Sequence, residues 1–553
     1  MSFNFKPYDS TLLFVPLGGC NEIGMNLNLY RYKGKWLMLD CGMGFADNYL
    51  PGIDVLFPNI DALLPYREDL LGLVLTHAHE DHIGAVQYLW SEFKCPLYAT
   101  PFTAAMLKPK LAEEGLKGQV KVHEVQAGVQ YELAPFSFEM VPITHSIPEM
   151  HAVAIRTDQG VVMHTGDWKL DSNPLVGPTT DEITLSRYGD EGVLAMVCDS
   201  TNVFVEGESG SENDVRENLT EIIKQCQDRV VVTTFASNIA RIETIIHAAI
   251  AAGRHVALAG KSLWRVTGAA QESGYLQNLP PFLTDKQGMD VPKDKIVFIC
   301  TGCQGESRAA LSKIARGEHP MIRLSPGDTV IFSARTIPGN NLEIGYMQNR
   351  LVEQGLELIT DHNSFIHVSG HPARMELERM YALVRPHIAV PVHGEQRHLT
   401  EHVRFAKELG VPEALKPYNG AVVALKKGAA EIVGRVESGY IALDGTSLID
   451  SNASVIRTRR KLRDDGVVIV SLALNKHGKL ASSIEISAPG CLDSDEDKEF
   501  IAGMVDEITT LIDNFKGKGG AAQLDNGIRA IVRREIKREI GKHPVITLHM
   551  LAA

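Results

Sequence analysis

The order of apolar and polar positions predicts a layered α/β chain. Over about the first 200 residues, apolar runs of strand length alternate with turn signals, for example LLFVPLGG, NLNLYRY, KWLMLDCG and LGLVLTH. Helical patterns such as HIGAVQYLWSEF lie between these runs, so strands and helices interleave along the chain. This interleaving favours an α/β fold over separate all-α and all-β parts.

The pattern of apolar and polar residues changes at about residue 210. An amphipathic pattern (NDVRENLTEIIKQCQD), a buried strand (RVVVTTF), a second helix (NIARIETIIHAAIAAG) and a strand (HVALAG) follow one another. That rhythm is typical of a parallel sheet, which KIVFICTG and DTVIFSA complete. Near the end, the strands GVVIVSLALN and PVITLHML enclose two helical stretches, which predicts a further small domain.

Composition narrows the class of protein. Of 553 residues, 44% are hydrophobic and 22% charged, the balance of an ordinary soluble globular protein. No apolar run approaches the roughly 20 residues that span a bilayer, and the first residues do not resemble an export signal. Eight cysteines, mostly in apolar runs, are typical of a reducing compartment, so we expect a cytoplasmic protein with no membrane contact. The Cys300-x-x-Cys303 pair fits structural thiols; a metal or redox pair is the alternative.

The formal charge of −13 argues against a protein that coats nucleic acid nonspecifically. It leaves room for a localised groove. Two basic clusters exist, and we expect each to be a solvated face. They are Arg457, Arg459, Arg460, Lys461 and Arg463, and then Arg533, Arg534, Lys537, Arg538 and Lys542.

The strongest chemical signal runs from Thr76 to His82. It reads Thr-His-Ala-His-Glu-Asp-His after the apolar strand LLGLVL. On an extended segment His77 and His79 project to one side, while Asp81 and His82 lie where the chain turns into a helix and face a second point. Imidazole and carboxylate ligands suit zinc, and two adjacent ions can activate water for attack on phosphorus. The segment therefore predicts a two-metal site.

This segment resembles the metallo-β-lactamase superfamily. The resemblance directs attention to His145, Asp167 and His393, each of which follows an apolar strand. It implies that His77, His79 and His145 bind one zinc, that Asp81, His82 and His393 bind the other, and that Asp167 bridges the two. Asp40 matches a further acidic position that orients the metal loop, although a turn-capping role is the alternative. Manganese or magnesium ions accept similar ligands.

The chain resembles the β-CASP nucleases within this superfamily. An α/β block interrupts the metal-binding pattern between Asp199 and His367, and Asp199, His371 and His393 match the family's motifs. The implied fold is α/β: a metallo-β-lactamase αββα sandwich (1–209 and 362–446), an inserted α/β β-CASP domain (210–361) and a small α/β C-terminal domain (450–553). A histidine at the position of His393 accompanies RNA rather than DNA substrates in that family.

The motifs FASNIARI, FSARTIPGN, HVSGH and PVHGE resemble the ribonuclease J family across essentially the whole chain. The resemblance implies a hydrolase that digests RNA from a 5′-monophosphate end and also cleaves internally, with roles in mRNA decay and rRNA maturation. Its partners would be single-stranded RNA, a second or further copies of this chain through the C-terminal domain, and other RNA-decay proteins. An RNA contact by the basic helix at 528–542 is the alternative for that domain.

Candidate catalytic and substrate-binding residues follow. Asp81, Asp199 and His371 are the catalytic candidates, with Asp199 holding His371 protonated so that it can assist the departing 3′-oxygen. Ser237 and Asn238 begin a helix, whose free N–H groups attract a phosphate; a simple N-cap is the alternative. The full substrate-binding set is Ser237, Asn238, Ser333, His367, Val368, Ser369, Gly370 and His371.

Other assignments remain open from sequence. Asp54 and Asp444 form a candidate calcium site, because relatives hold calcium nearby. A small-molecule hydrolase, a noncatalytic scaffold and a DNA-repair nuclease are the rival functions. All seven predicted ligands are present, which disfavours the scaffold, and His393 disfavours the DNA nuclease.

Overall fold

The computed structural model describes residues 3–337, 339–493, 495–515 and 520–553. They fall into two units. The first comprises Met1–Gly44 and Phe57–Gly439, and the second comprises Phe45–Leu56 and Tyr440–Ala553. Each is described separately below.

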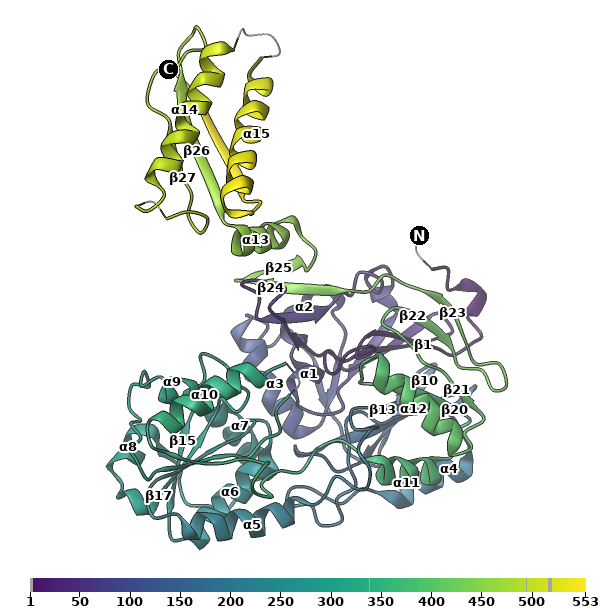
Figure 1. Ribbon diagram of the computed structural model, residues 1–553. Coiled ribbons are helices and arrows are strands. Elements are labelled where there is room, and N and C mark those ends of the chain that lie inside the picture. Colours follow the sequence, from purple (N-terminus) through teal and green to yellow (C-terminus); the bar gives the residue numbers. More distant parts are fainter. Residues whose placement is uncertain (1–2, 338, 494, 516–519) are drawn as a thin grey trace. The chain divides into compact units, whose positions relative to one another are not determined.

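Two stacked sheets form the centre of the first unit (Figure 1). The eight-stranded sheet runs in the order β23 (Glu431–Arg435), β22 (Ala421–Ala424), β1 (Leu13–Gly18), β2 (Leu27–Tyr32), β3 (Lys35–Leu39), β6 (Leu70–Val74), β7 (Leu97–Ala99) and β8 (Val122–Glu124). The seven-stranded sheet runs in the order β21 (Glu413–Ala414), β20 (Ile388–Val392), β13 (Val193–Asp199), β12 (Gly160–His164), β11 (His151–Thr157), β10 (Phe136–Pro142) and β9 (Gln130–Leu133).

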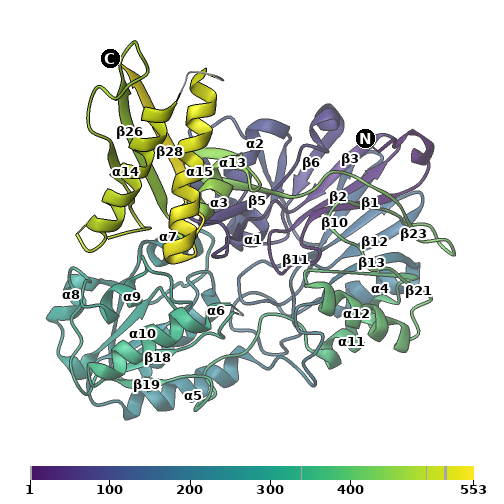
Figure 2. The ribbon, with the colours of Figure 1, turned by 45° about the horizontal axis from the view of Figure 1, so that its top comes forward.

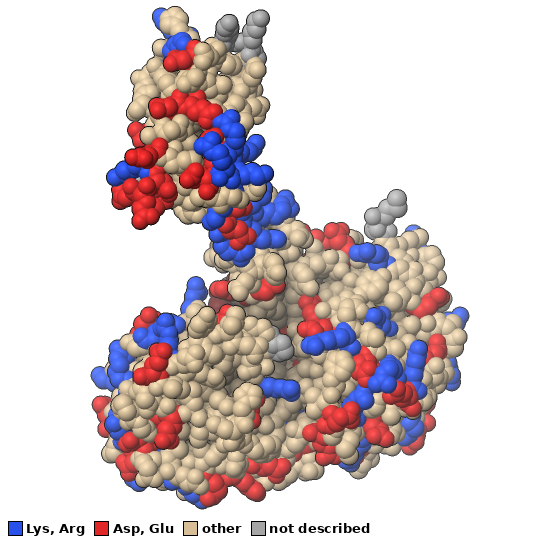
Figure 3. Space-filling view, in the orientation of Figure 1, with Lys and Arg blue, Asp and Glu red and all other residues tan. Residues whose placement is uncertain are grey.

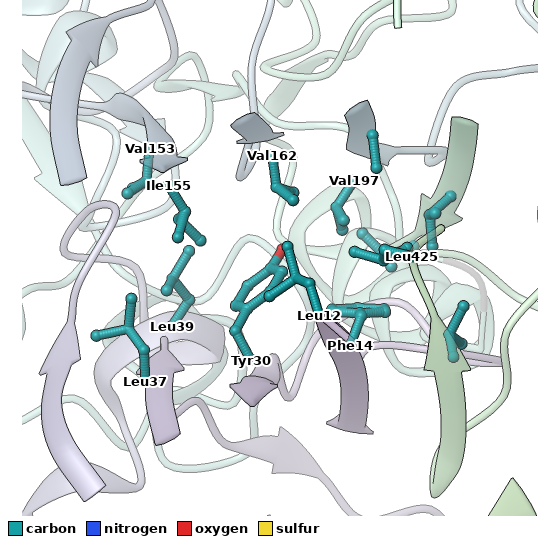
Figure 4. Close-up of a cluster of buried hydrophobic side chains, with 14 of the residues drawn as sticks. Leu12, Phe14, Tyr30, Leu37, Leu39, Val153, Ile155, Val162, Val197 and Leu425 are labelled. Atoms are coloured by element: carbon teal, nitrogen blue, oxygen red, sulfur yellow. The ribbon is translucent and has the colours of Figure 1, made fainter. Parts of the chain in front are cut away.

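Burial on both faces explains why the central strands are apolar throughout. In β13, Ala195 and Val197 point into the core between the two sheets, whereas Met196 and Cys198 point into the core under the helices. A strand that is covered on both sides needs a continuous apolar run, which is what VLAMVCD provides. Figure 4 shows the inter-sheet core, where Phe14 and Tyr30 of one sheet lie opposite Val162 and Val197 of the other.

Helices cover the outer faces and complete a four-layer αββα arrangement, as predicted. α1 (Glu80–Ile83), α2 (Val86–Phe93) and α3 (Pro101–Glu113) belong to the side of the eight-stranded sheet. α4 (Glu182–Glu191), α11 (Arg374–Val384) and α12 (Gln396–Glu408) pack on the seven-stranded sheet through the second core. The layers bring the carboxyl ends of β6, β10, β12, β13 and β20 to one region, from which the candidate site is built.

The predicted insertion forms a sheet of its own. Its strands run in the order β16 (Leu283–Thr284), β15 (His255–Ala259), β17 (Ile296–Cys300), β14 (Val230–Thr233), β18 (Thr329–Phe332) and β19 (Glu357–Ile359), all parallel. The helices are α5 (Glu212–Gln225), α6 (Ile239–Ala251), α7 (Lys261–Glu272), α8 (Asp285–Asp290), α9 (Ala310–Ala315) and α10 (Asn341–Glu353). These strands lie within the predicted range 210–361.

The second unit contains two sheets. One has the order β25 (Ser447–Asp450), β24 (Tyr440–Asp444), β5 (Val55–Pro58) and β4 (Gly44–Phe45). The other has the order β27 (Glu485–Ser487), β26 (Val467–Leu474) and β28 (Val545–Ala552), and it packs against α14 (Lys498–Asn514) and α15 (Gly520–Ile540). α13 (Ser454–Asp465) lies at one end of α15 in both views (Figures 1 and 2).

Segment 45–56 belongs to a different unit from the one that the predicted domain limits give it. It was placed in the catalytic domain by sequence, whereas it belongs to the second unit in the structure. Ile53 shares a small apolar core with Ala442 of β24 and Ile456 of α13, and this core accounts for the grouping. The apolar and polar pattern of the segment carries no sign of a partner about 400 residues away, so the contact could not be read from sequence.

No described helix is long and apolar enough to cross a membrane.

Candidate metal centre

Three overlapping groups of candidate ligand atoms meet at the carboxyl ends of the sandwich strands. His77, His79 and His145 form one group. Asp81, His82, Asp167 and His393 form the second group, and a third joins Asp167 and His393 to Asp199 and His371. Within each group the candidate ligand atoms all lie within 4.8 Å of one another. The seven residues predicted from sequence therefore converge.

The imidazoles of the first group face one another. His79 Nδ1 lies 3.0 Å from His77 Nε2 and 3.1 Å from His145 Nε2. Burial, and then the neighbouring imidazoles, lower the pKa of His77 well below its ordinary value, and burial lowers the pKa of His79 to about 4. These rings are therefore neutral, and their inward lone pairs are suited to a shared cation.

Outer hydrogen bonds fix the direction of these rings. The Nδ1–H of His145 donates to the Gly370 carbonyl at 2.6 Å, and the Nδ1–H of His77 donates to Thr76 Oγ1 at 3.0 Å. In both rings Nε2 is left as the inward acceptor. A Cβ at Gly370 would lie 2.6 Å from His145 Cε1, so the close approach needs glycine at this position.

The second group combines imidazoles with carboxylates. His82 Nε2 lies 3.1 Å from Asp167 Oδ2, and His393 Nε2 lies 3.2 Å from Asp81 Oδ2. Burial works against the Asp167 charge, but His393 and His82 hold the pKa of this carboxyl at about 2. The carboxylates are thus ionised at neutral pH. A pair of zinc ions takes ligands of this kind, with three neutral imidazoles on one side and a mixed set of imidazoles and carboxylates on the other. The residues present therefore fit two zinc ions.

Asp40 supports the centre from behind, as predicted. Its Oδ2 accepts from His82 Nδ1 at 2.7 Å, and its Oδ1 accepts from the Thr76 N–H at 2.9 Å. Because Asp40 holds both ends of the metal loop, it orients His82 and does more than cap a turn. Its backbone adopts φ 59°, a left-handed conformation that a residue other than glycine rarely takes.

The loop is also held by backbone pairing. Cys41 N–H donates to the His82 carbonyl at 2.7 Å, and Met43 N–H donates to the Glu80 carbonyl at 3.0 Å. Between them, a Cβ on Gly42 would lie 1.7 Å from the Asp81 carbonyl oxygen. Segment 40–43 can therefore approach the metal loop only with glycine at position 42.

Asp199 links two histidines of the site. Its Oδ2 accepts from His371 Nδ1 at 2.8 Å, which is the predicted pairing. Its Oδ1 accepts from Thr201 Oγ1 at 2.7 Å, and Thr201 in turn accepts from His393 Nδ1 at 2.8 Å. His371 and His393 stack with ring centroids 5.5 Å apart. Asp199 thus orients both rings.

The HVSGH segment lies beside this pair. Ser369 Oγ accepts from Asn202 Nδ2 at 2.8 Å, and the same amide donates to the His371 carbonyl at 3.0 Å. Val368 is buried and packs near Gly210. His367 Nδ1 is buried and makes no hydrogen bond with any described residue.

Ser237, Asn238 and Ser333 make hydrogen bonds within the protein. Asn238 caps α6 by accepting from Arg241 N–H at 2.8 Å, and Ile239 N–H donates to the Ser237 carbonyl, so few free N–H groups are left for an anion. Ser333 is buried, and its hydroxyl donates to the Ile366 carbonyl at 2.7 Å. Direct substrate contacts by these three residues stay predictions. Pro338 of the FSARTIPGN motif lies outside the described residues.

Sequence reasoning missed a buried ion pair behind the HVSGH segment. Arg241 and Glu212 pair through two contacts, at 2.8 and 3.0 Å. The guanidinium also donates to the carbonyls of Ser333 and Ile366, both at 2.9 Å. Both residues occupy amphipathic helices, where charged positions normally indicate solvent, so the sequence held no signal of their burial. Thr201 and Asn202 were also missed, although polar residues straight after a buried strand were the available signal.

The calcium site stays a prediction. Both carboxylate oxygens of Asp444 accept from Arg459, at 2.9 and 2.8 Å, so a guanidinium occupies the oxygens that a cation would need. The Cys300 and Cys303 thiols are buried, and burial raises the pKa of each above its ordinary value, as expected of structural thiols.

The fold and the paired ligand groups define the class of protein: a metal-dependent hydrolase of the metallo-β-lactamase type with an inserted second sheet. Family models agree. Residues 26–187 match the metallo-β-lactamase superfamily, 227–351 the ribonuclease J β-CASP domain, 357–415 the Zn-dependent metallo-hydrolase RNA specificity domain and 454–552 the ribonuclease J C-terminal domain.

Full-length relatives narrow this class to one family. The chain is 43% identical to "Ribonuclease J" of Sinorhizobium meliloti over 547 residues, which cover 98% of this chain and 97% of that protein. It is 37% identical to "Ribonuclease J" of Mycolicibacterium smegmatis, over 96% of this chain and 95% of that one. The chain belongs to the ribonuclease J family.

A solved structure agrees on the fold alone. A protein of unknown function from Enterococcus faecalis V583 superposes with a TM-score of 0.53 at 16% identity, covering 75% of this chain and 100% of that one.

The hydrogen bonds of Asp40 give a testable expectation. Asp40→Asn should weaken zinc binding about 10- to 100-fold, the usual effect of removing a carboxylate that orients a ligating histidine. Competition with a chromogenic chelator measures the affinity. Asp9→Asn, which removes an exposed carboxylate paired with Arg31, is the matched control and should leave the affinity unchanged. Wild-type zinc affinity in Asp40→Asn would contradict the role given to this residue.

Proposed function

We propose that this protein hydrolyses RNA phosphodiester bonds with a pair of zinc ions, acting both from a 5′-monophosphate end and internally, in mRNA decay and rRNA maturation. The observation that carries the proposal is the convergence of the seven ligands beside the Asp199–His371 pair. The full-length ribonuclease J relatives support RNA as the substrate.

Hydrolysis of the phosphodiester bond needs three contributions here: bound zinc, the charge of the carboxylates, and a proton donor. Bound zinc would contribute Lewis-acid stabilisation and activation of water. Asp81 and Asp167 place negative charge at the centre, and Asp199 fixes the His371 ring through Nδ1. The other ring nitrogen of His371 makes no hydrogen bond with a described residue, so it is free to donate a proton to the departing 3′-oxygen.

The first test is digestion of labelled RNA with and without a chelator. The wild-type protein should degrade RNA, lose activity with chelator and regain it with zinc or manganese. His371→Ala should lower the rate about 100- to 10,000-fold while zinc content is retained, because only the proton donor is removed. Wild-type turnover in His371→Ala would remove the proton-donor role, and equal hydrolysis of DNA of the same sequence would contradict RNA specificity.

We propose that His367 contacts the terminal 5′-phosphate and so underlies the 5′-end preference. Burial, and then the charges of Arg241, Arg335 and Lys169, lower the pKa of His367 well below its ordinary value. Arg241 and Lys169 are already paired with Glu212 and Asp171. Arg335 is exposed, and no described carboxylate pairs with it. An exposed guanidinium whose charge acts on a buried, unpartnered ring nitrogen suits a terminal phosphate.

His367→Ala tests this contact. The variant should raise KM for 5′-monophosphate RNA about tenfold and leave internal cleavage of a circular RNA unchanged, since a circle has no terminal phosphate. Comparison of 5′-monophosphate, 5′-hydroxyl and 5′-triphosphate RNA measures the preference. Equal loss on the circular substrate would assign His367 to general RNA binding instead.

We also propose a homodimer or homotetramer formed through the C-terminal domain, and other RNA-decay proteins as partners. β28 forms one edge of its sheet over eight residues, and Leu551 on it is 64% exposed. A long apolar edge strand favours pairing with another chain. The eight unpaired cysteines support a cytoplasmic location.

Leu551→Lys should shift the protein toward monomer in sedimentation, because it adds a charge to the edge strand. Leu448→Lys, at another exposed leucine of the same unit, is the control and should keep the wild-type mass. An unchanged assembly in Leu551→Lys would place the contact elsewhere.

A further inference from the structure

Charges in the second unit are unevenly distributed, although Asp464, Asp465 and Glu539 lie on the same helices as the basic side chains. Acidic side chains gather before and at the start of α14, whereas basic side chains gather on α13 and on the C-terminal half of α15 (Figure 3). The acidic group is Asp493, Asp495, Glu496, Asp497 and Glu499. A face that only keeps a protein soluble normally intersperses both signs. The uneven distribution therefore indicates a surface for a charged partner.

Part of the basic group is neutralised within the unit. Arg459 pairs with Asp444, Arg463 with Asp464, Arg534 with Glu507, and Arg538 with Glu535. The remaining cations have no ion pair with a described residue, and all of them are exposed or partly exposed. Arg457 is one of them, and its guanidinium donates to the Asn452 carbonyl. The other five, called the basic surface, are Arg460, Lys461, Arg533, Lys537 and Lys542.

The two helices that carry the basic surface meet at their ends. His543 N–H, just after α15, donates to Asp465 Oδ1 at the end of α13 at 3.2 Å. Val545 N–H donates to the Gly466 carbonyl at 3.1 Å. Attraction to a helix C-terminus accounts for Lys537 in the last turn of α15. It does not account for Arg460 and Lys461, which precede the last turn of α13.

Exposed aromatic rings lie beside α13. Phe45 is 75% exposed and Tyr49 is 71% exposed. The segment that carries them is attached to α13, because the Arg463 guanidinium donates to the Asn48 carbonyl. A Cβ on Gly52 would also lie 3.5 Å from the Arg459 guanidinium. Cations next to exposed aromatic rings are what proteins use to hold single-stranded nucleic acid, through phosphate pairing and base stacking.

We propose that the basic surface, with Tyr49, binds the backbone of single-stranded RNA outside the catalytic centre. This proposal rests on the proposed function, which identifies the bound polyanion as RNA. Lysine and arginine contacts to phosphates carry no sequence information, so this contact would retain any long RNA. The basic surface is confined to one part of the protein, so it can bind RNA although the net charge of the chain is −13.

Equilibrium binding of a 5′-monophosphate RNA of about 30 nucleotides to the full-length, chelated protein tests the surface. Replacement of Arg460, Lys461, Arg533 and Lys537 by Gln should weaken binding at least tenfold. It should also make the dependence of log Kd on log salt less steep, by up to about 3, since each lost phosphate contact removes about 0.7. Tyr49→Ala should weaken binding about five- to tenfold without changing the salt slope.

The matched control removes the same number of charges from the first unit. Lys117, Lys121, Lys426 and Lys427 are exposed, and their replacement by Gln should leave affinity and salt slope close to wild type. Unchanged binding in the first variant overturns the proposal. So does an equal loss in the control, which would reduce the effect to net charge, or a lost dimer in the first variant, which would assign the surface to self-association.

Hydrolysis of a short RNA separates this proposal from the proposed function. The basic-surface variant should keep wild-type kcat on a tetranucleotide and raise KM only on long RNA. A wild-type protein that binds RNA through this surface and cleaves none would contradict the proposed function alone. A wild-type protein that cleaves RNA with KM unaffected by the variant would contradict the surface alone.

Discussion

Convergence of ligand atoms from distant parts of the chain is the constraint on which the structure depends. The imidazole nitrogens of His77, His79 and His145 face one another at about 3 Å. Five of the seven candidate ligands are buried, and His79 and Asp81 are partly exposed. They stay together because the strands that carry them are held by the core between two sheets. The apolar burial of β13 and its neighbours therefore offsets the cost of crowding polar groups at the strand ends.

Backbone strain marks the points where this constraint is strongest. Asp40 and His393 both adopt left-handed backbone conformations, φ 59° and 52°, and each directly follows a buried strand. Such conformations cost about 1 to 3 kcal/mol and persist only where surrounding contacts fix them. At Asp40 the contacts are the bonds to Thr76 and His82. At His393 they are the bonds to Gly19 and Thr201. The strain turns two side chains toward the centre that a regular strand would point elsewhere.

The grouping of the seven candidate ligands could be predicted because two local signals were sufficient. The His77–His82 segment is contiguous, and His145, Asp167 and His393 each follow an apolar strand, so a family resemblance could select them. Apolar periodicity predicted a layered α/β chain, and the family resemblance implied the αββα order of its layers. What sequence could not supply were contacts between helices and returning loops. Arg241 and Glu212 look like solvated helix positions, and segment 45–56 looks like part of the catalytic domain.

The buried pair of Arg241 and Glu212 has a positional consequence for the site. Two fully buried charges are costly, and a well-packed apolar pair would often be as stable, so stability alone gives no reason for them. Their geometry gives one. Asp171 accepts from the Glu212 N–H, Glu212 holds the guanidinium, and the guanidinium holds the Ile366 carbonyl. The chain leaves the sandwich near Glu212 and returns at Ile366, directly before His367. One charge network therefore fixes both crossings of the insertion, and the position of His371 follows from a contact that no catalytic motif contains.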